Sequence, residues 1–444
     1  MRRGSPSLSP GTPGGAAAPP AIGPDMERRR INDVTYVSRE EALDLLSIKK
    51  ESFYSYVSRG LIRTAAHPDR RRRLYLKSDI EKLKTRVGEH LATVQVSYEL
   101  RYGKPVLQSR ITEITPTGPS YRGHPAIGLA CGPRRFEVVA ELLWTGVLRP
   151  RDIVWPRLPL PAAIPALANT WGASVPQMSM LSWFALTTLA LAAVPVGGPP
   201  ARNHDPWLAG KRLIQAFTGI AGLLGPSGRY TPLRDNESVA ECIARGLGYE
   251  ANAECVKLVD AALVLSADNE LSAPTFVARI TASTGADLYA CVASALHAQS
   301  GPMQVGGTAE VEGTFAALTD GTGGEAAAGG SPGADLPCFR HPLYARDPRT
   351  ALLLDLVATL KQPRPGTARI LDFIARTEQG SCQYPNVFAG LVVLAMALGL
   401  PAGSAALLHT LGRTAGWIAH ASEQRLVGAM LRPRAKFMEA RGGP

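Results

Sequence analysis

The sequence predicts an all-α body preceded by a small N-terminal head, and the apolar residues indicate this fold class. Hydrophobic residues form 45% of the 444-residue chain, enough for a sizeable core, but only 6% of residues are aromatic, and Ala and Leu dominate. Ala and Leu lose little conformational entropy in a helix and pack poorly on a pleated sheet. Period-two runs of Val, Ile, Thr and Tyr are few. Residues 89–444 are therefore expected to form helices that alternate with Pro/Gly turns.

The start of the chain and its most apolar run indicate a cytoplasmic protein. Residues 1–30 are rich in Pro and Gly and lack an apolar core, so they are expected to be disordered and to carry no secretion signal. Polar residues and Pro195 interrupt the apolar stretch 178–196, which predicts a buried core helix rather than a membrane span. The six cysteines form no CxxC pair and show no zinc-ligand spacing, which predicts free thiols and no bound metal.

Residues 31–88 have the element order of a winged helix-turn-helix domain: helix, tight turn, helix, wing, helix. Ser38 and Glu41 form a capping box, in which each side chain satisfies a free N–H group at a helix start. Gly60 suits the left-handed position that closes a helix. The stretch SREEALDLLSIKKESFYSYVSRGLI resembles MerR/excisionase-type heads. The expected elements are a helix over 39–46, a helix over 49–58, short strands at 61–63 and 73–76 around a basic loop, and a last helix over 80–87 capped by Ser78 or Asp79.

Positive charge in this head indicates a polyanionic partner. Between residues 26 and 90, sixteen Lys and Arg stand against ten Asp and Glu, and the whole chain has a net charge of +11. A basic surface on one small unit is typical of nucleic-acid binding, so DNA is the expected partner, with Phe53 and Val57 as the better candidates for the core. A solvated charged surface, or a head used only for packing or oligomerisation, is the alternative. The residues expected to meet a DNA groove or its phosphates are Lys49, Lys50, Ser52, Tyr54, Arg59, Arg70, Arg71 and Arg72.

Four motifs in the body occur in the order in which the citrate synthase family has them. The stretch 109–114 (SRITEI), followed by YRG at 121–123, resembles the family's S-x-I-T-x-I and Y-R-G, and FEVVAELLW at 136–144 resembles F-E-E-V-A-x-L-L-W. Each motif is weak alone, but from their joint order the chain is identified as a member of this family. The other stretches that resemble family motifs are 266–276 with 284–289 and 301–304, 339–344 with 347–349, and 384–387 with 412–420 and 432–434.

The resemblance implies a helical body of a large and a small domain that condenses an acyl-CoA with a 2-oxo acid, usually oxaloacetate. Acyl-CoA would be a co-substrate, and no bound cofactor is implied. Arg349 and Arg413 match family arginines that clamp the two carboxylates by forked hydrogen bonds. Arg432 matches the arginine that the family supplies from the partner subunit, which implies a homodimer. His341 matches the histidine that polarises the ketone, although its flanks are altered to Cys-Phe-Arg-His.

Several positions depart from the family pattern. Asn269 stands where the family has a histidine that touches the oxo acid, and an Asn side chain still donates a hydrogen bond. Gln304 replaces the histidine that holds the enolate oxygen, and Val305 adds bulk where the family has glycine. Phe388 replaces the Asp or Glu that acts as the base, and a benzyl group accepts no proton. Little or no condensation by the isolated homodimer is therefore expected.

The domain boundaries follow from the resemblance and from local composition. The large domain is expected at 89–307 and again at 413–444, with the small domain at 308–412 between them. Residues 306–336 are Gly-rich and of low complexity, so a flexible loop is expected there. Such a loop would weaken the domain closure that assembles a site of this kind.

Three hypotheses remain open from the sequence. The first is an active condensing enzyme that uses another base, such as Glu270, Asp347 or Glu423. The second is a non-catalytic or weakly active relative that binds an oxo acid or acyl-CoA through the arginine clamp and couples this ligand to DNA. The third is a decayed paralogue with a structural role, for instance in a mixed dimer with an active citrate synthase homologue, where Arg432 would serve the partner's site.

Overall fold

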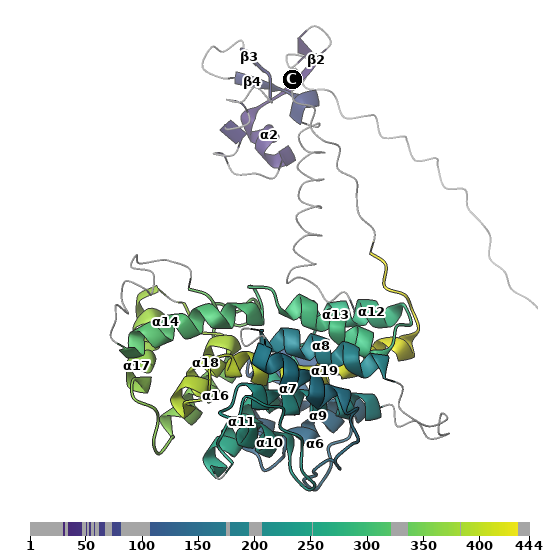
Figure 1. Ribbon diagram of the computed structural model, residues 1–444. Coiled ribbons are helices and arrows are strands. Elements are labelled where there is room, and N and C mark those ends of the chain that lie inside the picture. Colours follow the sequence, from purple (N-terminus) through teal and green to yellow (C-terminus); the bar gives the residue numbers. More distant parts are fainter. Residues whose placement is uncertain are drawn as a thin grey trace, which may run out of the picture. The chain divides into compact units, whose positions relative to one another are not determined.

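The computed structural model describes most of the body and parts of the head. The chain divides into two compact units, residues 1–106 and residues 107–444 (Figure 1). The predicted disordered tail up to residue 29 and six predicted DNA contacts (Lys49, Ser52, Arg59, Arg70, Arg71 and Arg72) lie outside the described residues. The described residues are 30–31, 34–46, 50, 53–54, 57, 62–66, 73–80, 107–174, 178–194, 207–250, 252–320, 336–381 and 383–433.

The head unit contains a four-stranded antiparallel sheet of order β1-β2-β4-β3 and the helix α2 (Arg39–Leu46). The helix predicted from the capping box is confirmed. The Ser38 N–H donates to Glu41 Oε2 at 2.9 Å, and the Glu41 N–H donates to Ser38 Oγ at 3.3 Å. Phe53 is fully buried in the core of this unit, and Val57 packs against it, as predicted. The strands are β1 (Arg30–Ile31), β2 (Val34–Val37), β3 (Thr64–Ala66) and β4 (Arg73–Leu76).

Two boundaries predicted for the head are wrong. The strand predicted at 61–63 lies three residues later, as β3, because Ile62 is buried in the core instead of pairing in the sheet. The last helix is already formed at Lys77, so neither Ser78 nor Asp79 caps it. The Asp79 carboxylate instead accepts three hydrogen bonds from Arg63. Two come from the Arg63 side chain at 2.9 Å, and one comes from the Arg63 backbone N–H at 3.1 Å. The strand predicted at 73–76 is confirmed as β4, whereas β1 and β2 were not predicted.

The described part of the body is mainly helical, as predicted, but it also contains a three-stranded antiparallel sheet of order β5-β6-β7 that was not predicted. The strands are β5 (Thr112–Thr115), β6 (Gly118–Tyr121) and β7 (His124–Pro125). The helices in the first part of the body, up to residue 266, are α5 (Ala126–Cys131), α6 (Phe136–Thr145), α7 (Ala163–Ser174), α8 (Met180–Ala193), α9 (Leu208–Ile220), η1 (Ala221–Leu223), α10 (Val239–Gly246) and α11 (Ala253–Ser266). The later helices are α12 (Ala273–Ser283), α13 (Leu288–Gln299), η2 (Val305–Gly307), α14 (Thr308–Asp320), α16 (Pro348–Ala358), α17 (Thr367–Ser381), α18 (Val387–Leu398) and α19 (Ser404–Val427).

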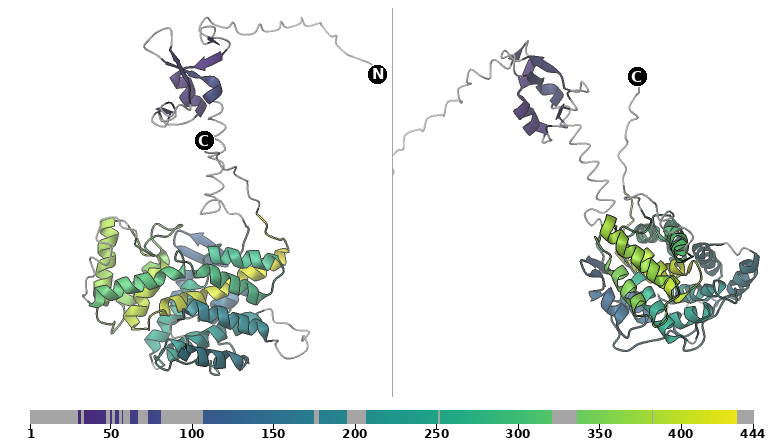
Figure 2. Two further views of the ribbon diagram at one scale, coloured as in Figure 1. Left: turned by 45° about the horizontal axis from the view of Figure 1, so that its top comes forward. Right: turned by 90° about the vertical axis from the view of Figure 1, so that its left-hand side faces the viewer.

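Helix α19 runs through the body and is buried along most of its 24 residues. It contacts α6, α8, α9, α11, α12, α13 and α18, and two views show it crossing the body in yellow (Figures 1 and 2). A helix buried on all sides needs small residues where its neighbours come close. A Cβ atom at Gly416 would lie 2.3 Å from Asp268 Oδ1, and one at Gly412 would lie 2.6 Å from the Leu263 carbonyl oxygen. The helix is continuous across residues 412 and 413, between which the sequence analysis placed a domain boundary.

The prediction of a flexible loop over residues 306–336 is wrong for the first half of this range, because η2 leads directly into the helix α14 there. Val311, Phe315 and Leu318 recur at helical spacing on α14 and are buried. This apolar face outweighs the low helix propensity of the glycines. Residues 321–335 lie outside the described residues. Helices α14, α16 and α17 each contact α18 at one end of the body (Figure 1), and the division into a large and a small domain stays a prediction.

The apolar stretch 178–196 contains the helix α8, whose Phe184 and Leu191 are buried, as predicted. No helix within the described ranges is both long enough and apolar enough to cross a membrane. The five cysteines in those ranges are free, and three of them are buried. The same ranges contain no group of three His, Cys, Asp or Glu side chains that could hold a metal ion.

Candidate active site

A buried ion pair at the start of α16 lies at the centre of the candidate site. Asp347 caps this helix, and Pro348 occupies the first helical position, where no N–H group is needed. Arg349 Nε and Nη2 donate to the two carboxylate oxygens of Asp347 at 2.9 and 2.7 Å, and the Val387 N–H adds a bond of 3.1 Å. Burial favours the neutral acid, but the Arg349 guanidinium outweighs it and holds the pKa of Asp347 below its usual value. Arg349 Nη1 is buried without a hydrogen-bond partner among the described residues, so it is available to a ligand oxygen.

His341 lies beside Arg349 with its ring held in one orientation. The N–H groups of Leu343 and Tyr344 donate to His341 Nδ1 at 3.1 and 3.2 Å, which favours the neutral tautomer with its proton on Nε2. Burial, together with the charge of Arg349, lowers the pKa of His341 to about 4. His341 Nε2 lies 3.2 Å from Arg349 Nη2. Two donors therefore face one point, where the oxygen of a carbonyl or carboxylate would accept from both.

Arg413 on α19 is a second buried guanidinium, and no carboxylate within the described ranges forms an ion pair with it. Its Nε donates to the Ser266 carbonyl oxygen at 2.8 Å, and its Nη1 donates to Ser272 Oγ at 3.4 Å. Burial lowers the pKa of Arg413 to about 10, and the group stays charged at neutral pH. A buried cation that only neutral groups contact is suited to bind an anion.

The turn between α11 and α12 carries Asn269 next to Arg413. Because Arg413 binds Ser266 and Ser272, it contacts both ends of this turn. Asn269 Oδ1 is buried and makes no hydrogen bond to any described residue. Glu270 has a φ of +54°, a left-handed conformation that is unfavourable for a residue with a side chain. Backbone strain of this kind is held by surrounding structure and is common at functional sites.

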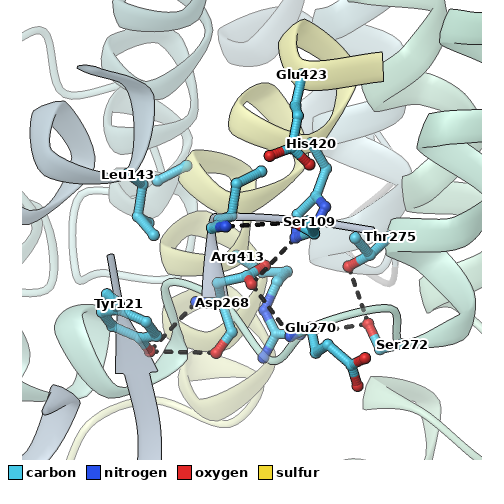
Figure 3. A network of polar contacts seen from close by, with 12 residues as sticks. Ser109, Tyr121, Leu143, Asp268, Glu270, Ser272, Thr275, Arg413, His420 and Glu423 are labelled. Carbon is cyan, nitrogen blue, oxygen red and sulfur yellow. Dashed lines mark hydrogen bonds and ion pairs between the residues drawn. The ribbon is translucent and has the colours of Figure 1, made fainter. Parts of the chain in front are cut away.

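A buried chain of hydrogen bonds supports this turn (Figure 3). Asp268 Oδ2 lies 3.2 Å from His420 Nε2, and His420 Nδ1 lies 3.2 Å from Arg279 Nη1. Because Arg279 only donates, His420 accepts at Nδ1 and donates to Asp268 from Nε2. Arg279 also pairs with Glu423 at 2.7 Å. The Tyr121 hydroxyl lies 3.2 Å from the Asp268 carbonyl oxygen and 3.3 Å from the Asp268 backbone nitrogen. Tyr121 thus helps to hold this turn, which its sequence motif did not predict.

Phe388, in the first turn of α18, lies in an apolar cluster. Its side chain packs against Leu181, Val305 and Ala406, which come from α8, η2 and α19. Val305 is only 1% exposed, so the bulk that this residue adds is fully used in packing. Two departures from the family pattern, Val305 and Phe388, therefore belong to one apolar cluster.

His409 is a site residue that the sequence analysis missed. It is 2% exposed and lies one helical turn before Arg413 on α19. Its Nε2 is 3.4 Å from Arg413 Nη2, its Nδ1 is 3.0 Å from Gln299 Nε2, and its ring centroid is 4.7 Å from that of Phe388. The spacing of four residues from Arg413 was the signal in the sequence, because residues i and i+4 share one face of a helix.

Gln304 and Arg432 are less closely tied to the other predicted site residues. Gln304 directly precedes Val305, and its backbone N–H donates to the Gly301 carbonyl oxygen at 2.9 Å. Its half-buried side chain makes no hydrogen bond within the described ranges. Arg432 is exposed, and no hydrogen bond or ion pair of the described residues joins it to His341, Arg349 or Arg413. Of the residues predicted from the sequence, direct contacts join His341 to Arg349, and His409 links Phe388 to Arg413.

Comparison with known proteins identifies the class of protein that carries this site. Residues 101–434 match the family model described as the citrate synthase C-terminal domain, and the chain therefore belongs to the citrate synthase family. The protein of Mycobacterium tuberculosis named "Putative citrate synthase 2" is 30% identical over 268 residues, which cover 56% of this chain and 71% of the relative. The citrate synthase of Synechocystis is 32% identical over 200 residues, which cover 40% of this chain and 47% of the relative.

Solved citrate synthases share the fold of this chain. The ternary complex of carboxymethyl coenzyme A and oxaloacetate with citrate synthase from Thermoplasma acidophilum has a TM-score of 0.65 at 20% identity and covers 78% of this chain and 97% of that one. Citrate synthase from Thermotoga maritima has a TM-score of 0.61 at 21% identity over the same shares of the two chains. The family match begins at residue 101, so it does not extend to the head.

Asp347→Asn is expected to destabilise the body by about 3–5 kcal/mol, because it leaves the buried Arg349 guanidinium without its counter-ion. The matched control is Asp372→Asn on α17, which breaks an exposed ion pair with Arg376 and should cost no more than about 0.5 kcal/mol. The folded-state pKa of Asp347 is lowered, so its contribution is present above its unfolded pKa and is lost as pH falls. Urea unfolding at about pH 7 and about pH 2.5 should therefore show less loss of stability on acidification in Asp347→Asn than in the wild type. Equal effects of the two substitutions at neutral pH would contradict this role of Asp347.

Proposed function

We propose that this protein binds a small 2-oxo dicarboxylic acid, with oxaloacetate as the model ligand, and condenses it with an acyl-CoA weakly or not at all. The observation that carries this proposal is the packing of Phe388 against Leu181, Val305 and Ala406, at the position that the family resemblance gives to the base. A benzyl group accepts no proton, and general acid–base catalysis contributes about 10²–10⁴-fold to rate. Loss of the base therefore removes turnover without removing the groups that hold the anion.

The groups Arg349, Arg413 and His341, here called the arginine site, support the proposal that the protein binds a dicarboxylic acid. Arg349 offers an unpaired buried Nη1, Arg413 has no carboxylate in contact, and His341 carries its proton on Nε2. A ligand carboxylate would supply the negative charge that Arg413 lacks and an acceptor for the free Arg349 Nη1 donor. The complex of Thermoplasma acidophilum citrate synthase with carboxymethyl coenzyme A and oxaloacetate supports the same ligand classes here, with acyl-CoA as a second ligand.

Two of the three carboxylates considered as replacement bases are already engaged. Asp347 binds Arg349, and Glu423 binds Arg279 at 2.7 Å and the Arg110 N–H at 2.9 Å. Glu270 is half-buried, and burial, with a further contribution from Asp268, raises the pKa of Glu270. Any residual condensation is therefore proposed to use Glu270.

Arg432 supports a homodimer as the working form of the site. Its side chain is exposed near the end of α19 and is not bound to the site of its own chain within the described residues. A carboxylate clamp completed by the partner subunit's arginine would use this residue as the family resemblance implies. A mixed dimer with an active citrate synthase homologue would use the same contact.

The purified full-length protein is expected to release free CoA from acetyl-CoA and oxaloacetate far more slowly than about 1 s⁻¹, the lower end of ordinary turnover numbers. Restoring the family residues is expected to raise this rate at least about 100-fold, because a base returns to the site. A spectrophotometric thiol assay measures the release. The restoring substitutions are Asn269→His, Gln304→His, Val305→Gly and Phe388→Asp.

The matched control carries Phe388→Asn in the same restored background, since Asn has the size of Asp but accepts no proton. No comparable gain is expected from it. Wild-type turnover at an ordinary enzymatic rate, lost in His341→Ala, would overturn the proposal. Loss of that turnover in Glu270→Gln as well would identify Glu270 as the base in use.

Calorimetric titration with oxaloacetate is expected to detect binding to the wild-type protein. Arg413→Gln keeps a hydrogen-bond donor but removes the charge, and it should weaken binding by about 10- to 100-fold, the usual worth of a hydrogen bond to a charged group. Arg229→Gln changes an exposed arginine in the same body and should leave the affinity unchanged. No binding heat with the wild type, or equal affinity in Arg413→Gln, would rule out the arginine site as the ligand site.

We further propose that the head binds duplex DNA. Lys50 and Tyr54 are exposed one turn apart on helical residues, whereas Phe53 between them is fully buried. Exposed basic and aromatic side chains beside a buried anchor fit a recognition helix that packs on its domain and presents its outer side to a major groove. The winged helix-turn-helix assignment and the contacts of Lys49, Ser52, Arg59 and Arg70 to Arg72 are part of this proposal.

Lys50→Ala is expected to weaken DNA binding to a similar degree for all sequences and to reduce the slope of log K against log salt by about 1. Fluorescence anisotropy of a labelled duplex, titrated at several salt concentrations, measures both. Lys257→Ala on α11 removes an exposed lysine of the body and should change neither quantity. If the titration shows no salt-dependent DNA binding by the wild type, DNA binding by the head is excluded, and a role in packing or oligomerisation is left.

A further inference from the structure

Each buried guanidinium of the arginine site lies next to the imidazole of a histidine. Arg349 Nη2 lies 3.2 Å from His341 Nε2, and Arg413 Nη2 lies 3.4 Å from His409 Nε2. The first pair belongs to the motifs that the family resemblance explains. The second pair has no such explanation, although His409 is as deeply placed as Arg413 itself.

The hydrogen bonds around His409 fit a neutral ring whose Nε2 lone pair faces Arg413. A guanidinium only donates, so His409 Nε2 accepts and the proton of the neutral ring lies on Nδ1. Nδ1 is 3.0 Å from the side-chain amide of Gln299. The amide oxygen accepts this proton once the amide is turned by a half rotation, an orientation that heavy-atom positions alone do not distinguish. The chain from Gln299 through His409 to Arg413 is then satisfied at every step.

We propose that His409 is a ligand-binding residue of the arginine site and takes up one proton when a ligand carboxylate binds Arg413. This inference rests on the proposed function, namely that the site binds a 2-oxo dicarboxylate. Before a ligand binds, the His409 lone pair accepts the Arg413 Nη2–H. A ligand carboxylate takes over that N–H, a proton from solvent binds to the freed His409 Nε2, and the imidazolium donates it in a hydrogen bond to the same carboxylate. No carbon bond changes, and the added positive charge is matched by the negative charge of the ligand.

The surroundings of His409 provide the reason for this coupling. Burial and the charges of Arg413 and Arg349 lower the pKa of His409 well below its ordinary value. From α13 the ring faces the uncharged Gln299, and from α18 it faces the benzyl ring of Phe388. The charges that act on His409 within the described residues are thus both positive, so the negative charge that favours an imidazolium must come with the ligand.

Two guanidinium–imidazole pairs define the class of ligand that the site prefers. One carboxylate would bind Arg349 and His341, and the other would bind Arg413 and His409. A dianion can bind at both pairs, whereas a monoanion leaves either Arg413 without a counter-ion or the buried Arg349 Nη1 donor without a partner. The inference therefore predicts a preference for dicarboxylates that becomes stronger as pH falls, because the carboxylate at Arg413 can then be matched by the His409 imidazolium.

The test is calorimetric titration of the full-length wild type and His409→Gln with oxaloacetate, over pH values from about 8 to about 5.5 and in buffers of different ionisation enthalpy. His409→Gln keeps an acceptor for Arg413 but has no titrating ring. The wild-type affinity is expected to rise more steeply than that of His409→Gln as pH falls, by up to about tenfold per pH unit, with up to one more proton taken up per ligand. His341 and the ligand titrate alike in both proteins, so their contributions cancel in the difference.

His297→Gln is the matched control, because it removes an exposed histidine from α13, the helix that also carries Gln299. It should behave as the wild type. Equal proton uptake in the wild type and His409→Gln would overturn the role of His409 and leave the oxo acid site in place. No oxaloacetate binding in the wild type would overturn the proposed function, and the role of His409 with it.

A second measurement covers the case in which His409→Gln does not fold. The ¹⁵N spectrum of the wild type with labelled histidine, recorded at about pH 6, should show one more imidazolium after oxaloacetate is added than before. His409→Asn, the shorter amide, assigns that signal. An unchanged number of imidazolium signals in the oxaloacetate-saturated wild type would contradict the proposal directly.

Discussion

The body of this protein depends on the burial of guanidinium groups between packed helices. Removing a charged group from water costs several kcal/mol, so each buried arginine needs fixed partners. Arg279 and Arg349, each 1% exposed, meet this demand with the carboxylates of Glu423 and Asp347. Arg413 meets it only with neutral acceptors: a carbonyl oxygen, a hydroxyl group and an imidazole. Of these three arginines, Arg413 is therefore the one without a carboxylate in contact among the described residues, and an anionic ligand would supply it.

The substituted positions argue against simple decay of an inherited site. Loss of a catalytic carboxylate without compensation would leave a cavity or an unsatisfied polar group, and both destabilise a core. Phe388 and Val305 instead belong to one apolar cluster with Leu181 and Ala406. The cationic half of the site keeps its supports, since the Asp268–His420 pair still holds the turn that carries Asn269. Under the proposed function, a site with Phe388 in place of the base and with its buried arginines still supported would be organised for binding.

The sequence was sufficient for features that depend on neighbours along the chain. The capping box of α2, the strand β4 and the apolar helix α8 follow from local patterns, and the Asp-Pro-Arg motif brings Arg349 next to its counter-ion. The Gly-rich composition predicts a loop where α14 forms, because it conceals the helical spacing of the buried Val311, Phe315 and Leu318. The sheet β5-β6-β7 was missed because its strands are too short to show a period. His409 was missed because its contact with Gln299, which is 110 positions away in the chain, is not visible in the sequence and only its spacing from Arg413 pointed to it.

The position of these groups on different elements bears on how a ligand could act on the body. Arg349 projects from α16, Phe388 from α18, and Arg413 and His409 from α19. A ligand shifts a conformational equilibrium only by as much as its affinity differs between the two states. Under the proposed function, a dicarboxylate that bridges Arg349 and Arg413 would have this difference, because its two charges would be fully matched only when α16 and α19 hold both guanidinium–imidazole pairs close together. Without turnover the ligand would remain in place as the missing counter-ion, so occupancy of the site, rather than a chemical product, would be what the rest of the protein senses.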